Sequence, residues 1–445
     1  MTRYPAYPKY KETGIEWLGE IPAHWEVHRL KHISSINFSN VDKHTHEDEE
    51  SVYLCNYTDV YHNDYIVPEM EFMKATASPN EIEEFTLSKG DIIVTKDSET
   101  WDDIAVPAYV AYEFENVLCG YHLALITPDP NVTEGSYLFR QFFAPGINAQ
   151  FKVTANGITR YGLGKYWLDN ALFLVPPLPE QRAIAAFLDE RTARLDAAAA
   201  EDRRQADLLR EQRAALISHA VTQGLDPDAP RKDSGIPWLG EIPAHWEVMR
   251  IKYLLHDIVD TEHKTAPFYP DGEYLVVRTS NIRNGQLIFD DAKYTDFEGF
   301  VEWTQRGVPE PGDILFTREA PAGEACIVPA EVPLCIGQRT VLLRVNQNVL
   351  DSQFALWSLY SGVVEEFIEL LSQGSTVDHL NMADIPNIPI VYPPLPEQRA
   401  IAAYLDEQTA RIDAALAEID AAIAHLEEYR AALIAAAVTG KIDVR

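Results

Sequence analysis

The feature that most constrains this chain is a segment that occurs twice. Residues 176–190 and 393–407 differ only in having Phe187 in the first copy and Tyr404 in the second. We call the separation of the two copies along the sequence, from Pro176 to Pro393, the repeat offset. Each copy opens with prolines, which suit the first turn of a helix but cannot continue one. Alanine and long unbranched side chains follow, and these favour a helix. The chain is therefore predicted to consist of two halves, each a mixed segment followed by a long helix.

Both helical stretches carry apolar residues at heptad spacing. The seam positions are Leu188, Leu195, Leu209 and Leu216 in the first stretch and Leu405, Ile412, Ile419, Leu426 and Leu433 in the second. A seam sustained over several heptads indicates a coiled coil. Two copies of one sequence are the obvious partners, although two unrelated helices on separate cores are an alternative. The first stretch would span about 66 Å at ~1.5 Å per residue, so the pair is predicted to be an antiparallel spacer.

A second block also recurs, at residues 14–27 and 235–248. Its glycine and proline residues indicate a structured loop. We expect its paired tryptophans to pin it onto the module or the helices: Trp17 and Trp25 in one copy, Trp238 and Trp246 in the other. The adjacent histidines, His24 and His245, have no neighbouring nucleophile and are interpreted as packed or hydrogen-bonded residues.

The segments between these blocks diverge but keep a common skeleton. Residues 90–96 match residues 312–318 as a turn followed by a strand, and an aromatic-rich helical stretch follows in both halves. Residues 157–159 align with residues 374–376. The predicted fold is α+β: two α+β modules, separated by two long helices forming an antiparallel coiled coil, as a pseudo-two-fold tandem repeat. The expected boundaries are 1–175 for the first module, 176–232 for the central helix and linker, 233–392 for the second module and 393–445 for the C-terminal helix.

Composition gives one conflicting signal. The net charge is −32, which argues against a chain that contacts phosphates with Lys and Arg. Net charge does not, however, give the local charge of a single concave face. The four cysteines form no CxxC pair, so no disulfide framework or zinc site is indicated. No signal-peptide core or membrane-length apolar run occurs, and a cytoplasmic protein is expected.

Catalytic signatures are missing from the sequence. There is no Walker A motif, no GxGxxG after a strand, no HExxH, and no Asn-Pro-Pro-aromatic tetrapeptide typical of amino-methyltransferases. The carboxylates form no pattern that singles out an acid/base pair. The sequence therefore favours a chain that is not an enzyme, with no metal and no cofactor of its own.

These motifs together resemble the specificity subunit of type I restriction-modification enzymes. The resemblance rests on the repeated block at 14–27 and 235–248, the repeated helix start and the tandem layout, and it covers essentially the whole chain. It implies that the modules are target recognition domains, each reading one half of a split, asymmetric site in double-stranded DNA. It also implies that the helices set the gap and dock two methyltransferase (modification) subunits. S-adenosylmethionine would then belong to those partners and ATP to a restriction subunit.

Candidate DNA contacts follow from the residue types that reach base edges and phosphates. In the first module they are Lys96, Thr159, Arg160, Tyr161 and Lys165. In the second they are Arg278, Asn281, Arg283, Arg318, Gln338 and Arg339. Each could instead be a surface ion-pair partner.

Two other functions fit parts of the sequence. A specificity subunit of a related restriction enzyme with fused methylase and nuclease would share this architecture. An acidic decoy that mimics the charge of DNA would explain the net charge but would not need two divergent modules on repeated supports.

Overall fold

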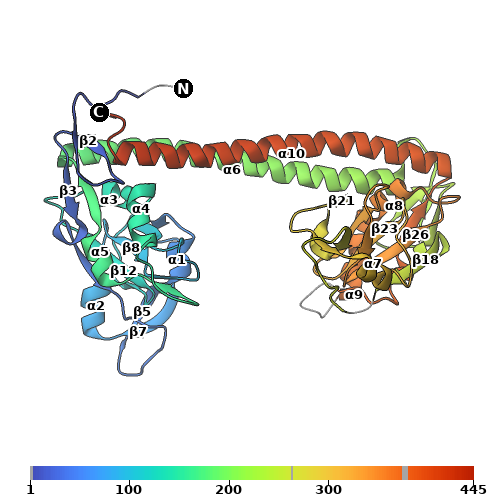
Figure 1. The fold of residues 1–445 in the computed structure, drawn as a ribbon, viewed down its shortest axis with the longest axis horizontal. Coiled ribbons are helices and arrows are strands. Elements are labelled where there is room, and N and C mark those ends of the chain that lie inside the picture. Colours follow the sequence, from blue (N-terminus) through green and yellow to red (C-terminus); the bar gives the residue numbers. More distant parts are fainter. Residues whose placement is uncertain (1–3, 262–263, 373–378) are drawn as a thin grey trace. The chain divides into compact units, whose positions relative to one another are not determined.

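The structure is a computed structural model that describes residues 4–261, 264–372 and 379–445, so the predicted Gly374-Ser375-Thr376 match lies outside the described residues. The chain divides into two compact units. The first comprises Met1–Asp202 and Ala421–Arg445, and the second comprises Arg203–Asp420. Each unit thus contains one α+β module together with part of both long helices (Figure 1).

The module of the first unit is built on a five-stranded sheet of order β4-β12-β8-β10-β6, next to a three-stranded sheet of order β11-β5-β7. Its central strand reads Ile-Ile-Val-Thr and is buried at every position, as expected of β-branched residues inside a sheet. The strands are β1 (Tyr10–Glu12), β2 (Glu20–Pro22), β3 (Glu26–Arg29), β4 (Ser34–Phe38), β5 (Glu50–Cys55), β6 (Tyr65–Ile66), β7 (Met73–Ala77), β8 (Ile92–Thr95), β9 (Asp97–Ser98), β10 (Pro107–Val110), β11 (Val117–Cys119), β12 (Leu123–Pro128), β13 (Tyr161–Gly162) and β14 (Leu172–Val175). The short helices are η1 (Leu30–His32), α1 (Tyr57–Tyr61), α2 (Pro79–Phe85), α3 (Gly135–Gln141), α4 (Pro145–Lys152) and α5 (Lys165–Asn170).

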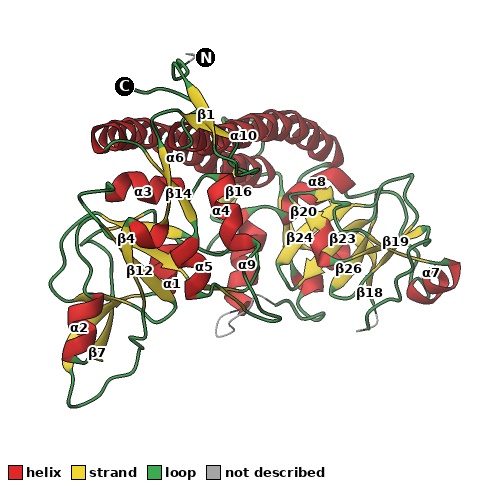
Figure 2. Cartoon of the chain, turned by 60° about the vertical axis from the view of Figure 1, so that its left-hand side comes forward, coloured by secondary structure: helices red, strands yellow, loops and turns green. Residues whose placement is uncertain are grey.

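The module of the second unit repeats this plan with a four-stranded sheet of order β18-β26-β23-β24 and a three-stranded sheet of order β22-β19-β25. Its strands are β15 (Arg231–Asp233), β16 (Glu241–Pro243), β17 (Glu247–Arg250), β18 (Leu255–Asp260), β19 (Tyr274–Val277), β20 (Ile282–Arg283), β21 (Gln286–Leu287), β22 (Lys293–Thr295), β23 (Ile314–Arg318), β24 (Ala322–Ile327), β25 (Leu334–Ile336), β26 (Thr340–Val345) and β27 (Pro389–Tyr392). Its helices are η2 (Ile251–Tyr253), η3 (Thr279–Asn281), α7 (Phe297–Trp303), α8 (Ser352–Leu359), α9 (Gly362–Ser372) and η4 (Ile385–Asn387). Strands and helices are thus mixed in both modules, as predicted (Figure 2).

The long helices are α6 (Leu178–Gln223) and α10 (Leu395–Val438). In the first unit, the start of α6 shares a hydrophobic core with the end of α10, through Leu188 and Ile434. In the second unit, the end of α6 shares a core with the start of α10, through Ile217 and Leu405. The start of each helix therefore packs against the end of the other, and the predicted antiparallel arrangement is confirmed.

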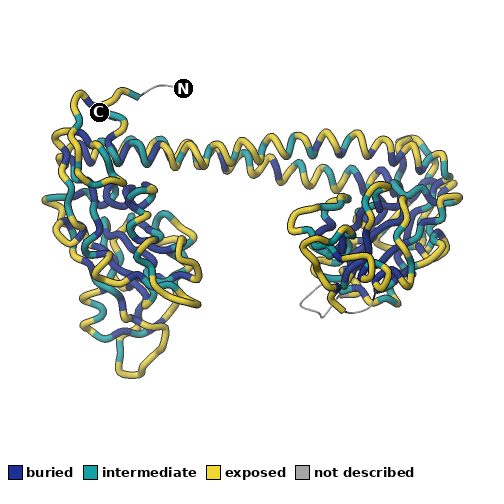
Figure 3. Tube along the Cα trace, in the orientation of Figure 1, coloured by how far each residue is buried: buried dark blue, intermediate teal, exposed yellow. Residues whose placement is uncertain are grey.

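Some of the predicted seam residues are buried and the others are half-buried. Leu188, Leu405, Ile412 and Leu433 are buried, while Leu195, Leu209, Leu216, Ile419 and Leu426 are half-buried. Figure 3 shows the same pattern along the helices, where buried and exposed positions alternate, and shows continuous buried segments inside the modules. The role of these residues as a spacer stays a prediction.

The two recurring blocks contact each other in both units. In the first, His24 Nε2 lies 2.7 Å and Trp25 Nε1 lies 2.9 Å from the Glu180 carboxylate at the start of α6. In the second, His245 Nε2 and Trp246 Nε1 both lie 2.9 Å from the corresponding Glu397 carboxylate. We refer to each His-Trp-Glu set as a clamp, because it fastens the loop to the first turn of a long helix.

The clamps test the expectation about the repeated block. Trp25 and Trp246 are fully buried, so these two tryptophans do pin the block. The other pair is less covered, because Trp17 and Trp238 remain 41% and 42% exposed, although the Trp17 ring lies against Gly146 of α4. The interpretation of the two histidines as hydrogen-bonded residues is confirmed by their contacts with glutamate.

Candidate nucleic-acid interface

The predicted contact residue Lys96 follows β8 directly and is fixed by backbone hydrogen bonds. Its N–H donates to the carbonyl of His122 over 3.1 Å, and its carbonyl accepts from the N–H of Leu163 over 2.7 Å. Lys96 therefore lies where the end of β8, the turn before β12 and the segment after β13 meet.

Arg318, at the end of β23, has the same backbone partners in the second module. Its N–H donates to the carbonyl of Arg339 over 3.0 Å, and its carbonyl accepts from the N–H of Leu380 over 2.9 Å. The repeat offset relates both of these partners to those in the first module, Arg339 to His122 and Leu380 to Leu163. The structure thus places Lys96 and Arg318 at equivalent backbone positions.

The side chains around Lys96 form a partly aromatic, basic face. Lys96 Nζ donates to the carbonyl of Ser39 over 2.8 Å and lies 4.8 Å from the centroid of the Tyr121 ring. Burial lowers the pKa of Lys96 from its usual value. Lys165, at the start of α5, lies 5.8 Å from the centroid of Phe38, a ring that Lys96 also approaches at 5.4 Å. The structure therefore brings two of the predicted lysines to one place.

The remaining candidates of the first module lie on one loop. Thr159 and Arg160 are exposed, and Tyr161 pairs with Ser98 where β13 joins β9, next to Lys96 in sequence. Gly157 is required at the base of this loop, since a Cβ there would lie 1.9 Å from the carbonyl oxygen of Arg160. The loop thus joins the strand that begins directly after Lys96.

In the second module, Arg278, Gln338 and Arg339 line one cavity of about 360 Å³. Phe268 and Ser280 also contribute to its wall. A concave surface with two guanidinium groups, an amide and an aromatic ring has the chemistry that base edges and phosphates need.

Three other candidates of the second module are buried or hydrogen-bonded within it. Asn281 is fully buried and its amide donates to the carbonyl of Ile288 over 3.0 Å. Arg283 donates to the carbonyl of Thr279 over 2.7 Å, and Arg318 is only 4% exposed. These three side chains do not line the cavity described above, and their contacts with DNA stay predictions.

The sequence reasoning missed the acidic residues beside these candidates. Asp97 directly follows Lys96, and its carboxylate lies 2.8 Å from His122 Nδ1. Glu319 directly follows Arg318, and its carboxylate lies 3.4 Å from Arg339 Nε. The repeat offset, which the two helix starts define, also relates His122 to Arg339 and could have revealed that the two positions correspond.

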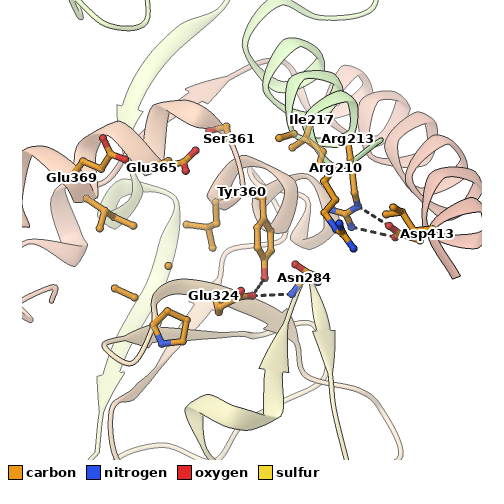
Figure 4. A pocket seen from close by; sticks show the side chains of 17 residues that line it. Arg210, Arg213, Ile217, Asn284, Glu324, Tyr360, Ser361, Glu365, Glu369 and Asp413 are labelled. Carbon is orange, nitrogen blue, oxygen red and sulfur yellow. Dashed lines mark hydrogen bonds and ion pairs between the residues drawn. The ribbon is translucent and has the colours of Figure 1, made fainter. Parts of the chain in front are cut away.

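The attachment of the second module to the helices leaves an open cavity of about 490 Å³ (Figure 4). On the helix side, Arg213 of α6 donates to Asp413 of α10 over 2.9 Å. On the module side, the hydroxyl of Tyr360 donates to Glu324 over 2.7 Å. Figure 4 shows both pairs among the residues that line this cavity, one on the long helices and the other on the module.

The structure shows no metal centre in this region or elsewhere among the residues it describes, since none of them form a cluster of three or more potential ligands. In the described ranges, the helices also lack the combination of length and apolar character that a membrane span requires.

Comparison with known proteins identifies the family. A model of the type I restriction modification DNA specificity domain matches residues 22–201 and again residues 243–423. The chain belongs to this family. The two matches coincide with the two modules and the adjoining parts of the long helices, so the tandem repeat is a repeat of this domain.

The curated relatives carry names of the same kind. The chain is 25% identical to a putative type I restriction enzyme MjaX specificity subunit of Methanocaldococcus jannaschii, over 98% of each chain. It is 23% identical to the type I restriction enzyme EcoBI specificity subunit of Escherichia coli, over 70% of this chain and 67% of that one. The family match and these names give no support to an acidic decoy or to a fused methylase-nuclease system.

A solved structure shares the fold. It belongs to work on complex assembly and conformational transition of the type I R-M system, and it aligns with a TM-score of 0.67 over 94% of this chain and 98% of that chain, at 19% identity. At this identity the likeness shows the fold alone. It supports two modules and two long helices in one chain.

Proposed function

We propose that this chain is the DNA-recognition subunit of a type I restriction-modification complex, in which each module reads one half of a bipartite, asymmetric site. The observation that carries the proposal is the shared backbone position of Lys96 and Arg318, which is surrounded by different polar side chains in the two modules. A protein that reads two different half-sites needs two modules with the same backbone arrangement and different side chains at the contact positions.

In this proposal the chain itself catalyses nothing. The helices α6 and α10 set the gap between half-sites and dock two methyltransferase subunits, with restriction subunits in the full assembly. S-adenosylmethionine is the cofactor of the methyltransferase subunits and ATP that of the restriction subunit. The recognition domains correspond to 1–175 and 233–392, the helical segments to 176–232 and 393–445, and the complex acts in the cytoplasm.

Because the net charge is −32, we expect the partner subunits to contribute to DNA binding. Phosphate contacts supply a large share of the affinity of DNA-binding proteins and require cations on the protein. We therefore expect the isolated chain to bind DNA weakly at low salt and the complex with a methyltransferase subunit to bind far more tightly.

The test is to co-express this chain with its cognate methyltransferase subunit and to map methylated bases across a host genome by single-molecule sequencing. A two-part motif with a fixed gap, methylated only when this chain is present, is the expected result. An assembled complex that adds no methylation would overturn the proposed function.

A further inference from the structure

Each module holds a pair of one basic side chain and one carboxylate at the same backbone position. In the first module the pair is His122 with Asp97, at 2.8 Å between Nδ1 and Oδ2. In the second it is Arg339 with Glu319, at 3.4 Å between Nε and Oε1, and Glu319 also lies 3.6 Å from Nδ1 of His379. Asp97 and Glu319 directly follow Lys96 and Arg318 in the sequence. His122 and Arg339 supply the carbonyls to which the N–H groups of Lys96 and Arg318 donate.

Further hydrogen bonds show that the two turns correspond. Gly120 N–H donates to the carbonyl of Cys55 over 2.9 Å in the first module, and Gly337 N–H donates to that of Val277 over 2.8 Å in the second. These glycines lie at matching places just before the two basic residues. The turns that carry the two basic residues are therefore built alike.

The pairs are also matched in their exposure to solvent. Asp97 and Glu319 are both 27% exposed, while His122 is 36% and Arg339 is 47% exposed. The carboxylates are thus the more protected members. The basic side chains remain accessible to a ligand, beside the exposed Tyr121 in the first module and in the wall of the cavity of about 360 Å³ in the second.

Residue type differs where position is kept. The pair is His with Asp in the first module and Arg with Glu in the second, so the same backbone position presents an imidazole in one module and a guanidinium in the other. Arg339 also has a left-handed backbone with φ 72°, which residues other than glycine rarely adopt and which in many proteins marks a functional site. The structure therefore keeps a guanidinium in the cavity wall despite an unfavourable backbone conformation.

The chemistry of both pairs suits base reading. Asp97 engages Nδ1 of the imidazole, which leaves Nε2 as the ring nitrogen that can contact a base. The ring is held further by an edge contact with Tyr121, at 4.8 Å between centroids. Glu319 engages Nε of Arg339, which leaves the two terminal nitrogens for a bidentate contact with guanine.

We infer that residues 122 and 339 are matched base-reading positions, one for each half of the target, and that Asp97 and Glu319 are positioning residues that hold them. The inference rests on the proposed function, since it names the residues through which each module discriminates its half-site. It concerns double-stranded DNA as the ligand and base edges as the groups read.

The experiment maps methylation motifs for the co-expressed complex with single variants of this chain. We expect His122→Ala to reduce the preference for one base pair about tenfold or more, in one half-site only, and Arg339→Ala to do the same in the other half-site. Asp97→Asn and Glu319→Gln should relax the same base pairs as the corresponding alanine variants, and Asp97→Glu and Glu319→Asp should restore the preference.

Matched controls come from the same modules. His28 forms a pair of the same kind with Glu26, at 2.8 Å and with 32% of its side chain exposed, but on β3. The variant His28→Ala should leave the motif unchanged. So should Arg306→Ala in the second module, where the exposed Arg306 donates to the carbonyl of Asp260 over 3.3 Å. Assembly with the methyltransferase subunit, followed by size-exclusion chromatography, checks that each variant folds.

The outcomes separate this inference from the proposed function. A wild-type complex that yields a two-part motif, with variants at 122 and 339 that leave it unchanged or relax the same half, overturns the inference and keeps the function. Effects of the alanine variants without matching effects of Asp97→Asn and Glu319→Gln overturn the positioning role. A wild-type complex without a motif overturns both.

Discussion

The two units attach their modules to the long helices at corresponding positions but with different chemistry. In the first unit, buried Arg140 donates to Asp189 of α6 over 2.9 Å. In the second, Trp357 donates through its indole N–H to Asp406 of α10 over 2.8 Å. The repeat offset relates each member of the second pair to its counterpart in the first. An aspartate on the helix is common to both attachments, and the module supplies a different donor.

A second attachment differs in the same way. In the first unit, Arg430 of α10 pairs with Asp196 of α6 at 2.8 Å and also with Asp64 of the module. In the second, Arg213 of α6 pairs with Asp413 of α10 at 2.9 Å. The first arginine ties helices and module together through a module carboxylate, while the second lies over the ring of Trp357, 5.6 Å from its centroid, and borders the cavity of about 490 Å³. The helices thus offer repeated attachment points, and the divergent modules use them to different extents.

The two clamps have the same geometry, so disrupting either should lower the stability of the protein by a similar amount. This is the largest effect that we expect. Trp25→Ala and Trp246→Ala each remove a fully buried indole that donates to a helix glutamate, so each should lower the free energy of unfolding by about 3–5 kcal/mol. Chemical denaturation of the purified chain measures this. Trp17→Ala, at a 41% exposed position, is the control and should cost far less. A loss below about 1 kcal/mol for either clamp would contradict their role.

Disrupting the two module attachments should lower the stability by different amounts. Asp189→Ala leaves the guanidinium of Arg140, only 1% exposed, without its carboxylate and should cost about 2–3 kcal/mol. Asp406→Ala leaves a neutral indole N–H without this acceptor and should cost about 1 kcal/mol. Denaturation of both variants, with Glu190→Ala on the exposed face of α6 as control, gives the comparison. Equal costs would show that the two attachments are energetically alike.

The interhelical arginines should differ by a smaller amount. Arg430→Ala removes contacts with both Asp64 and Asp196 and should cost about 1–2 kcal/mol, whereas Arg213→Ala removes a contact with Asp413 and should cost about 1 kcal/mol. Hydrogen exchange offers a local readout, because only the first variant should also loosen the segment around Asp64. Unchanged exchange there would mean that Arg430 does not hold the module.

The clamp of the first unit should weaken in acid. Burial opposes ionisation of Glu180, but hydrogen bonds from His24 and Trp25 outweigh it and hold the pKa of Glu180 below its usual value. A carboxyl with a lowered pKa in the folded state stabilises the fold above its unfolded pKa of about 4.3, and this stabilisation is lost as the pH falls through the folded pKa.

Glu180→Gln should therefore flatten the acid side of the stability profile below about pH 4.5. Urea denaturation of this variant and of the wild type at a series of pH values measures the effect. A profile of Glu180→Gln that stays parallel to that of the wild type would show that this carboxyl does not contribute to the acid dependence.

Local sequence patterns predicted the features that depend on short-range periodicity and on repetition. The heptads from Leu188 to Leu216 and from Leu405 to Leu433 indicated long helices, and the near-identical helix starts indicated equivalent environments. The antiparallel arrangement followed from two similar halves in one chain. These inferences required no knowledge of which loops meet in space.

The candidate site could be predicted only in part, because its side chains are oriented by several elements. Lys96 lies among Ser39 of one loop, Tyr121 of another and Leu163 of a third. Asn281 resembled a surface amide in the sequence but is drawn inside by the carbonyl of Ile288. Such contacts depend on tertiary structure, which residue type and spacing do not specify.

The most direct test of two equivalent modules reading two half-sites is site-specific photo-crosslinking. A photoreactive phenylalanine analogue would replace Tyr121 in one variant and Gln338 in another, each assembled with the methyltransferase subunit on DNA that carries the mapped motif. The account predicts that position 121 crosslinks to one half-site and position 338 to the other. Crosslinks of both positions to the same half-site, or of neither while methylation proceeds, would contradict it.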